Sequence, residues 1–239
     1  MAIVENTVVY TDEDVVLEAF FAFDDSVTGR RPAVLISHAW GGRDGFVAEK
    51  ARKLAGLGYV GFALDMYGKG VLGSGIKQNT LLMQPFMEDR AKLQKRMKVA
   101  LATVKMLPWV DDKKIAAMGF CFGGLCVLDL ARTGVDIQGV VSFHGLLGTP
   151  ENIQHNKIKA KILALHGRDD PMVPPEHVLA FQEEMTQAEA DWQFVSYGHT
   201  VHAFTNPVAN DPDFGTVYQA DADRRSWQAM QNFFTEIFA

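Results

Sequence analysis

Short, mostly apolar runs alternate with helical segments along most of this chain, and this alternation constrains the fold more than any other feature. The runs are residues 33–37, 59–64, 114–118, 139–143, 161–165 and 192–196. Such a run is typical of a strand that is covered on both faces. Strands that alternate with helices predict a mostly parallel sheet with helices on both of its faces.

Two β-rich segments, residues 7–11 and 15–23, precede this pattern and predict an antiparallel pair, so about eight strands are expected. The helical segments are residues 46–57, 86–106, 125–131 and 222–238. The Gly- and Ser-rich stretch 68–84 predicts a loop or a partial lid near a site. Because no linker, repeat or low-complexity stretch interrupts the sequence, we expect residues 1–239 to form a single domain.

Charge and cysteine content exclude several classes of protein. Lys and Arg number 23 against 29 Asp and Glu, and no basic run stands out, which argues against a nucleic-acid or anionic-membrane surface. The two cysteines, Cys121 and Cys126, are too few and too close for a disulfide scaffold and favour a reducing compartment. Since the sequence has neither a signal-peptide pattern nor an apolar stretch of about 20 residues, we expect a soluble cytoplasmic protein that does not enter a membrane.

A nucleophile candidate follows the apolar run 114–118. The sequence there is Gly119-Phe-Cys-Phe-Gly-Gly124, and a helical run comes next. Strand, G-x-C-x-G and helix form the nucleophile-elbow pattern of an α/β-hydrolase, with Cys121 in the place of the usual serine. The N-terminus of the helix favours a thiolate, and the N–H of Phe122 is an expected oxyanion donor. An ordinary Gly-rich turn with a buried cysteine is the alternative, and Cys126 inside the helix is expected to be a core residue.

An acyl-transfer cysteine needs a general base and an acid that orients it. The loop after the run 192–196 offers His199 and His202, and the loop after the run 161–165 offers Asp169 and Asp170. From the residues alone, both choices stay open. The order nucleophile, acid, histidine is that of the α/β-hydrolase triad, and all three positions follow strand ends.

These motifs resemble those of the dienelactone hydrolase family, which are α/β-hydrolases that use a Cys-His-Asp triad on esters and lactones. The resemblance covers nearly the whole chain and rests on the segments 37–42, 119–124, 165–174 and 202–207. It implies an α/β-hydrolase fold, and it selects Asp170 as the acid and His202 as the base. It also implies that the loop after the third strand supplies a second oxyanion N–H, for which Trp40 fits best and Ala39 is the alternative.

Two positions depart from the family pattern. Ala39 stands where the enzymes most like the founding dienelactone hydrolase carry a glutamate that controls thiol ionisation, and Asn206 stands where they carry a substrate-binding arginine. The resemblance therefore implies the hydrolytic chemistry without the founding specificity. His38 is a candidate neighbour for the thiolate, although a buried, hydrogen-bonded histidine is the simpler interpretation.

Other kinds of site were weighed against the triad. Arg43 and Arg90 are candidate ligands for an anionic substrate group, as is Arg168, and a solvated surface charge is the alternative for each. No metal is expected, because H-E-x-x-H and Cys-Cys-His spacings are missing from the sequence. No cofactor is expected either, because the segment 119–124 lacks both G-x-G-x-x-G and a P-loop lysine.

The sequence therefore predicts a cytoplasmic carboxylesterase or lactone hydrolase with carboxymethylenebutenolidase-type activity among the options. Its expected partners are a small ester or lactone and, at most, a second copy of the chain, as monomer or homodimer. The alternative is a catalytically quiet α/β-hydrolase that binds a small ligand, because a fold does not guarantee its chemistry.

Overall fold

The computed structural model describes residues 2–153 and 157–239 and divides the chain into two compact units. The first unit ends at Met118 and the second begins at Gly119. Eight strands form one sheet in the order β1-β2-β4-β3-β5-β6-β7-β8, which confirms the expected α/β class with about eight strands. The expectation of a single domain over residues 1–239 stays a prediction.

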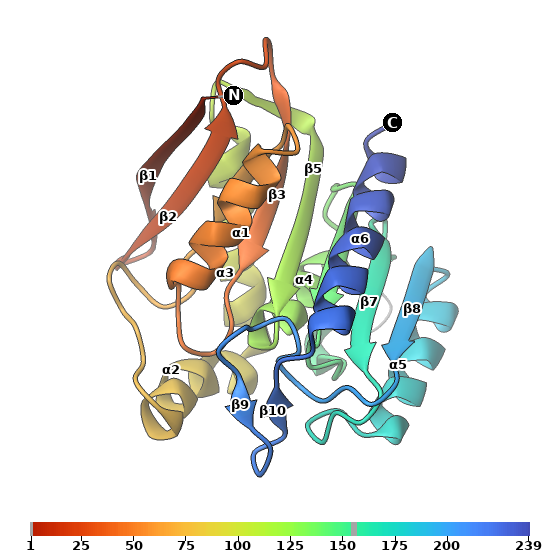
Figure 1. Ribbon diagram of the computed structural model, residues 1–239. Coiled ribbons are helices and arrows are strands. Elements are labelled where there is room, and N and C mark those ends of the chain that lie inside the picture. Colours follow the sequence, from red (N-terminus) through yellow and green to blue (C-terminus); the bar gives the residue numbers. More distant parts are fainter. Residues whose placement is uncertain (1, 154–156) are drawn as a thin grey trace. The chain divides into compact units, whose positions relative to one another are not determined.

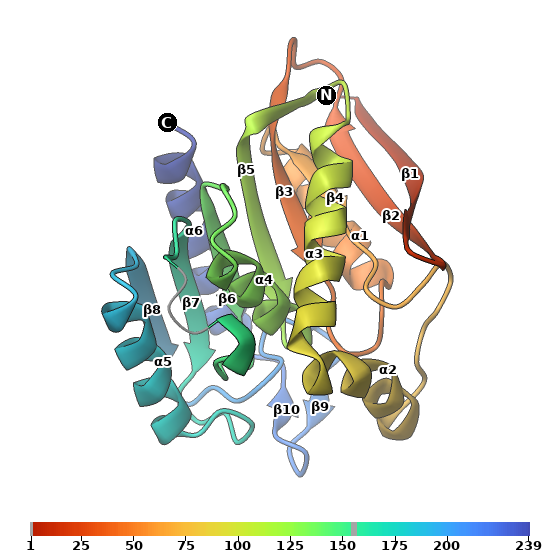
Figure 2. The same cartoon turned by 180° about the vertical axis from the view of Figure 1, so that it is seen from behind.

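The first unit contains the antiparallel strands and three helices. Its elements are β1 (Ile3–Asp12), β2 (Val15–Asp24), β3 (Arg31–Ser37), α1 (Gly45–Ala55), β4 (Val60–Ala63), α2 (Ile76–Glu88), α3 (Arg90–Lys105) and most of β5 (Val110–Phe120). The pair β1–β2 is antiparallel, as predicted, and β3 pairs with β4 in parallel. Helix α1 covers one face of these strands (Figure 1), and α3 covers the opposite face (Figure 2).

The second unit contains three parallel strands with helices on both faces. Its elements are α4 (Phe122–Arg132), β6 (Gly139–Phe143), a 3-10 turn (Glu151–Ile153), β7 (Lys161–Gly167), α5 (Pro175–Gln187), β8 (Trp192–Tyr197), the short strands β9 (Asn210–Asp211) and β10 (Thr216–Val217), and α6 (Ala220–Ile237). Strands β6, β7 and β8 are parallel neighbours. Helix α6 lies on one face of them (Figure 1), and α4 and α5 lie on the other (Figure 2).

Burial follows the apolar patterns that predicted these elements. Every residue of β4 and β6 is buried, as expected for strands covered on both faces. Along α6, Met230, Phe234 and Ile237 are buried and Trp227 is half-buried, so the predicted spacing marks the helix face that packs on the strands.

The region before α3 differs from the prediction. Residues 76–88 form a helix where a loop was expected over 68–84, and the single helix expected over 86–106 is divided at Asp89. A side-chain cap at Asp89 marks the division, and two side-chain bonds to Ser74 lie just before the start of α2. The side chain of Gln78 accepts hydrogen bonds from the Ser74 N–H and hydroxyl at 2.9 Å, and the Asp89 carboxylate accepts one from the Lys92 N–H at 2.9 Å. The loop was predicted from Gly and Ser residues, all of which lie at positions 68–75, before the helix begins.

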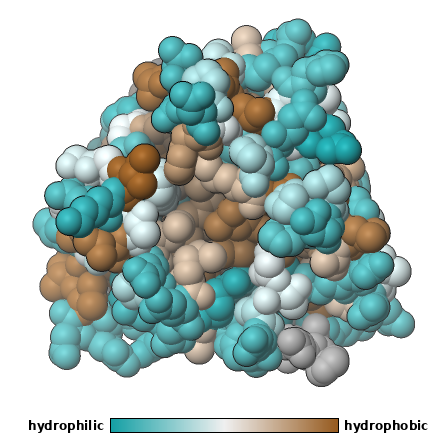
Figure 3. Space-filling model, turned by 90° about the horizontal axis from the view of Figure 1, so that it is seen from below, coloured by the Kyte–Doolittle hydropathy of each residue, from teal (hydrophilic) through white to brown (hydrophobic). Residues whose placement is uncertain are grey.

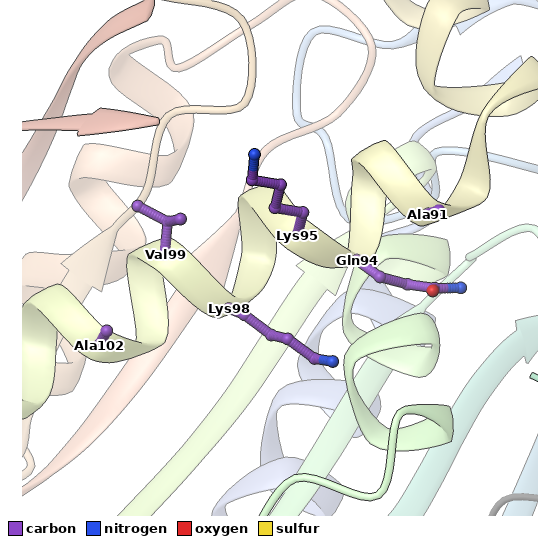
Figure 4. Close-up of a pocket in the computed structure, with 6 residues that line it drawn as sticks. All are labelled: Ala91, Gln94, Lys95, Lys98, Val99 and Ala102. Carbon is purple, nitrogen blue, oxygen red and sulfur yellow. The ribbon is translucent and has the colours of Figure 1, made fainter. Parts of the chain in front are cut away.

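Helix α3 carries a shallow surface hollow of about 470 Å³ (Figure 4). All six residues that line it belong to this helix: Ala91, Gln94, Lys95, Lys98, Val99 and Ala102. Because one helix face supplies the whole lining, the hollow is a dip between side chains, and it has no enclosing wall that would hold a substrate.

Figure 3 shows the molecule from below the view of Figure 1. Apolar residues reach the surface at several places on this face. Leu72, Ile76 and Leu81 are large exposed hydrophobic residues of the first unit, and Phe214 is one of the second. Among the described residues, no helix is both long and apolar enough to cross a bilayer.

Candidate active site

Cys121 lies on a sharp turn between β5 and α4. The strand ends at Phe120, the helix begins at Phe122, and Cys121 between them has a left-handed backbone with φ 55°. Only glycine fits two residues earlier, because a Cβ on Gly119 would lie 2.0 Å from the carbonyl oxygen of Gly123. A non-glycine residue with positive φ on such a turn is strained, as expected for a nucleophile elbow.

The two cysteines have different surroundings, as the sequence predicted. Cys121 is half-buried at the start of α4, whereas Cys126 is fully buried inside that helix. The carbonyl of Cys121 accepts from the N–H of Gly124 at 2.9 Å, which begins the helical hydrogen bonding. The Phe122 N–H belongs to the first helical residue, and such N–H groups point out of the helix N-terminus, where negative charge is favoured.

Asp170 and His202 form a buried pair. The Nδ1 of His202 lies 2.7 Å from Oδ2 of Asp170, and the two residues are 2% and 3% exposed. The other carboxylate oxygen, Oδ1, accepts from the Met172 N–H at 2.9 Å. Both carboxylate oxygens are therefore engaged, which fixes the carboxylate and through it the orientation of the imidazole.

The loops that carry this pair meet because β7 and β8 are parallel neighbours. Gly167 ends β7, and a Cβ at this position would lie 2.6 Å from the carbonyl oxygen of Thr200 and 2.7 Å from that of Val201. The Asp169 N–H also donates to the Thr200 carbonyl at 2.9 Å. Close backbone packing at a glycine thus brings the two loops into contact.

A short hairpin, β9 and β10, holds the main chain of His202. The His202 N–H donates to the Gly215 carbonyl at 3.0 Å, and the Val217 N–H donates to the His202 carbonyl at 3.2 Å. Gly215 has φ 76°, and a Cβ there would lie 2.2 Å from Cγ of Pro171. The hairpin therefore contacts both His202 and the residue that follows Asp170. Sequence reasoning did not find this hairpin, because its strands have only two residues each.

The electrostatics of His202 favour its protonated form. Burial lowers the pKa of His202, but the negative charge of the Cys121 sulfur and the hydrogen bond to Asp170 outweigh it and raise this pKa to about 10. Cys121, Asp170 and His202 therefore interact within the second unit. An imidazolium beside a thiolate is the activated form of a cysteine nucleophile.

The competing candidates in the same loops lie at the surface. His199 is exposed on a left-handed turn with φ 54°, and Asp169 is exposed next to the buried Asp170. His166, which lies in β7, and His144, which follows β6, are buried near the pair and were not among the site residues predicted from the sequence. Burial lowers the pKa of His166, and the nearby Asp170 opposes this shift. The sequence feature that could have identified both histidines is their position at the end of a strand, where sites of parallel sheets lie.

The other predicted site residues lie in the first unit. Trp40 is half-buried in the loop after β3, and its carbonyl accepts from the Tyr67 hydroxyl at 3.0 Å. Arg43 donates to Glu18 at 2.9 Å, which offsets part of its charge, and Arg90 is half-buried at the first position of α3.

His38 is the buried, hydrogen-bonded histidine of the simpler interpretation. Its Nδ1 lies 2.6 Å from the Ala39 carbonyl oxygen, and its Nε2 accepts from the Met66 N–H at 3.2 Å. Because Nε2 accepts a hydrogen bond it carries no proton, so the ring is neutral with both nitrogens engaged, and burial lowers its pKa. A role as a charged partner of the thiolate does not fit these contacts.

Among the described residues, no group of three or more histidine, cysteine or carboxylate side chains is arranged to hold a metal ion. Asp170 and His202 form a buried, hydrogen-bonded pair, and Cys121 lies at the start of α4. The family model of the dienelactone hydrolase family matches residues 17–238. The chain belongs to the dienelactone hydrolase family. Its eight-stranded sheet and its helices are the α/β-hydrolase architecture of that family, as the resemblance of its motifs implied.

Three known proteins are similar to this chain. The solved structure described as a dienelactone hydrolase-like promiscuous phosphotriesterase from metagenomic libraries is 36% identical, covers 100% of both chains and has a TM-score of 0.95. An uncharacterized protein of Caenorhabditis elegans is 42% identical over 64% of this chain and 98% of its own length. A putative carboxymethylenebutenolidase of Yersinia pestis is 24% identical over 92% of this chain and 84% of its own.

Proposed function

We propose that the protein hydrolyses small carboxylic esters or lactones through a Cys121–His202–Asp170 triad and a thioester acyl-enzyme. Activity of the carboxymethylenebutenolidase type is among the options, because several family members carry that name. The observation that carries the proposal is the buried 2.7 Å hydrogen bond between His202 and Asp170, together with the effect of Cys121 on the pKa of His202.

In the first half-reaction, the Sγ thiolate of Cys121 attacks the carbonyl carbon of the substrate. The Phe122 N–H, at the N-terminus of α4, and the Trp40 N–H are the proposed donors to the oxyanion. As the carbon–oxygen bond to the leaving group breaks, His202 Nε2 gives its proton to the departing alkoxide, and a thioester remains on Cys121. A lactone keeps its alcohol tethered to the acyl chain at this stage.

In the second half-reaction, neutral His202 takes a proton from water, and the resulting hydroxide attacks the thioester carbon. The carbon–sulfur bond breaks, the acid leaves, and the imidazolium–thiolate pair is restored. Asp170 keeps Nδ1 protonated throughout, so that Nε2 is the nitrogen that exchanges protons. With Ala39 in place of the family glutamate, the charge of His202 and the α4 N-terminus are the features that favour the thiolate.

The wider expectations are part of the same proposal. Residues 1–239 act as one catalytic domain in the cytoplasm, where a reducing environment keeps Cys121 free. The protein acts as a monomer or homodimer on a small substrate, without metal, cofactor or nucleic acid. Arg43 and Arg90 are the proposed ligands for an anionic substrate group.

The experiment is a panel of p-nitrophenyl esters and lactones assayed with wild-type protein, Cys121→Ala and the matched control Cys126→Ala. We expect Cys121→Ala to lose at least about 1,000-fold in kcat/KM, whereas Cys126→Ala keeps most of the activity at some cost in Tm. Equal turnover by wild type and Cys121→Ala would disprove the mechanism. Tight binding of a panel compound without turnover by any variant would favour the ligand-binding alternative.

A phosphotriester is the second candidate substrate class. It is favoured by the 36% identity, over the whole of both chains, to the protein described as a promiscuous phosphotriesterase. The same triad would attack phosphorus in place of carbon, and a phosphorylated cysteine would replace the thioester. Adding a p-nitrophenyl phosphotriester to the panel tests this, and turnover that persists in Cys121→Ala would exclude it as a reaction of this site.

A further inference from the structure

A second histidine, His144, lies against His202 in the second unit. It directly follows β6, is 3% exposed, and has a left-handed backbone with φ 38°. Its N–H donates to the Leu165 carbonyl at 2.8 Å, which ties this strained residue to β7. Non-glycine residues with positive φ carry a conformational cost and are enriched at functional sites.

The ring of His144 makes directed contacts. Its centroid lies 5.1 Å from that of His202, with the ring planes 66° apart, and it makes a similar edge contact with Phe204 at 5.1 Å. Its Nε2 lies 2.8 Å from the hydroxyl oxygen of Thr205, which is 1% exposed. The imidazole of His144 is therefore fixed by a hydrogen bond on one side and packs against the proposed base on another.

We propose that His144 is a positioning residue for His202 and that the Thr205 hydroxyl sets the angle of its ring. This inference rests on the proposed function, since it assigns a supporting role to a residue beside the triad. Asp170 holds only Nδ1 of His202, so the imidazole can still tilt about that hydrogen bond. The edge contact with His144 restricts this tilt and keeps Nε2 aimed at the sulfur and then at the leaving group.

The choice of histidine over an apolar ring supports this role. A buried imidazole costs desolvation unless it is hydrogen-bonded, and packing alone would be served by phenylalanine. The bond to Thr205 supplies such a hydrogen bond at Nε2 and gives the ring an angular anchor that a phenyl group lacks. Thr205 follows His202 by three residues, so one loop carries both the base and the anchor of its neighbour.

The test compares Thr205→Val, which keeps the shape and removes the hydroxyl, with Thr205→Ser, which keeps the hydroxyl. We expect Thr205→Val to lower kcat about tenfold with little change in KM, and Thr205→Ser to restore kcat to near the wild-type value. In a His144→Phe background, Thr205→Val should have no further effect, because the hydroxyl then has no imidazole to orient.

Ser226→Ala is the matched control, since it removes a buried hydroxyl that donates to the Asp223 carbonyl in α6. It should leave kcat unchanged.

A second readout does not depend on ester turnover. The low-field proton NMR resonance of the His202–Asp170 hydrogen bond, identified by its loss in Asp170→Asn, should shift in Thr205→Val and return in Thr205→Ser. The positioning role is overturned if the resonance is unchanged in Thr205→Val. It is also overturned if Thr205→Ser is as slow as Thr205→Val, or if Thr205→Val is equally harmful in the His144→Phe background. If turnover proves independent of Cys121, the proposed function fails while the resonance still decides the role of His144.

Discussion

At the residue scale, the geometry of the site depends on glycines where the backbone leaves no room for a side chain. Gly167 is one of them, because a Cβ at this position would lie within 2.7 Å of the carbonyl oxygens of Thr200 and Val201, in the loop that carries His202. We predict that Gly167→Ala lowers both kcat and stability, the latter by about 1–3 kcal/mol, as expected for overpacking. Gly148→Ala is the control, since a Cβ there meets nothing within 4 Å. Kinetics and urea unfolding of both variants check this, and equal behaviour would contradict the argument.

The two adjacent aspartates provide a second residue-scale prediction. Asp170→Asn leaves His202 without its buried carboxylate and should lower kcat by about 100-fold or more, whereas Asp169→Asn should keep most of the activity. The two histidines should differ as the two aspartates do. We expect His202→Ala to lose activity and His199→Ala to keep most of it. Steady-state kinetics of the four variants decide this. Greater loss at Asp169 or at His199 would mean that the wrong acid or base has been chosen.

At the element scale, the β9–β10 hairpin supports the base, although its strands are short. Gly215→Ala would place a Cβ 2.2 Å from Pro171 and displace the hairpin from His202. We predict a fall in kcat that exceeds any change in KM, because the hairpin bonds to the main chain of the base and to no expected substrate group. A change confined to KM would contradict this role, and the kinetics of the variant distinguish the two cases.

Long, buried elements could be predicted from the sequence, whereas short or capped ones could not. Strands β6 and β7 begin at the predicted residues because continuous apolar runs mark them. Helix α2 and the hairpin escaped prediction, because Gly75 at the N-cap of α2 has no capping side chain and a two-residue pairing leaves no periodic signal. For the site, the strand ends predicted the loops, but the choice of Asp170 over Asp169 came only from the family resemblance. The bonded pair in the structure is consistent with that choice.

At the scale of the whole molecule, protonation of His202 links the site to the stability of the fold. The folded-state pKa of about 10 exceeds the unfolded value of about 6.5, so the folded chain holds this proton more tightly. The resulting stabilisation is fully present below about pH 6.5 and is lost as the pH rises towards 10, at up to about 1.4 kcal/mol per pH unit. Urea unfolding at pH 7, 8 and 9 should therefore show wild type losing stability relative to His202→Gln. Parallel pH dependence of the two proteins would contradict the raised pKa.

The central claim is that Cys121 carries the acyl group during turnover. The most direct measurement is the mass of the protein after brief reaction with a p-nitrophenyl ester and an acid quench, followed by peptide mapping. We predict a mass increase of one acyl group on the peptide that contains Cys121, absent from Cys121→Ala and present in Cys126→Ala. An acyl group on any other residue, or steady turnover by Cys121→Ala, would contradict the account.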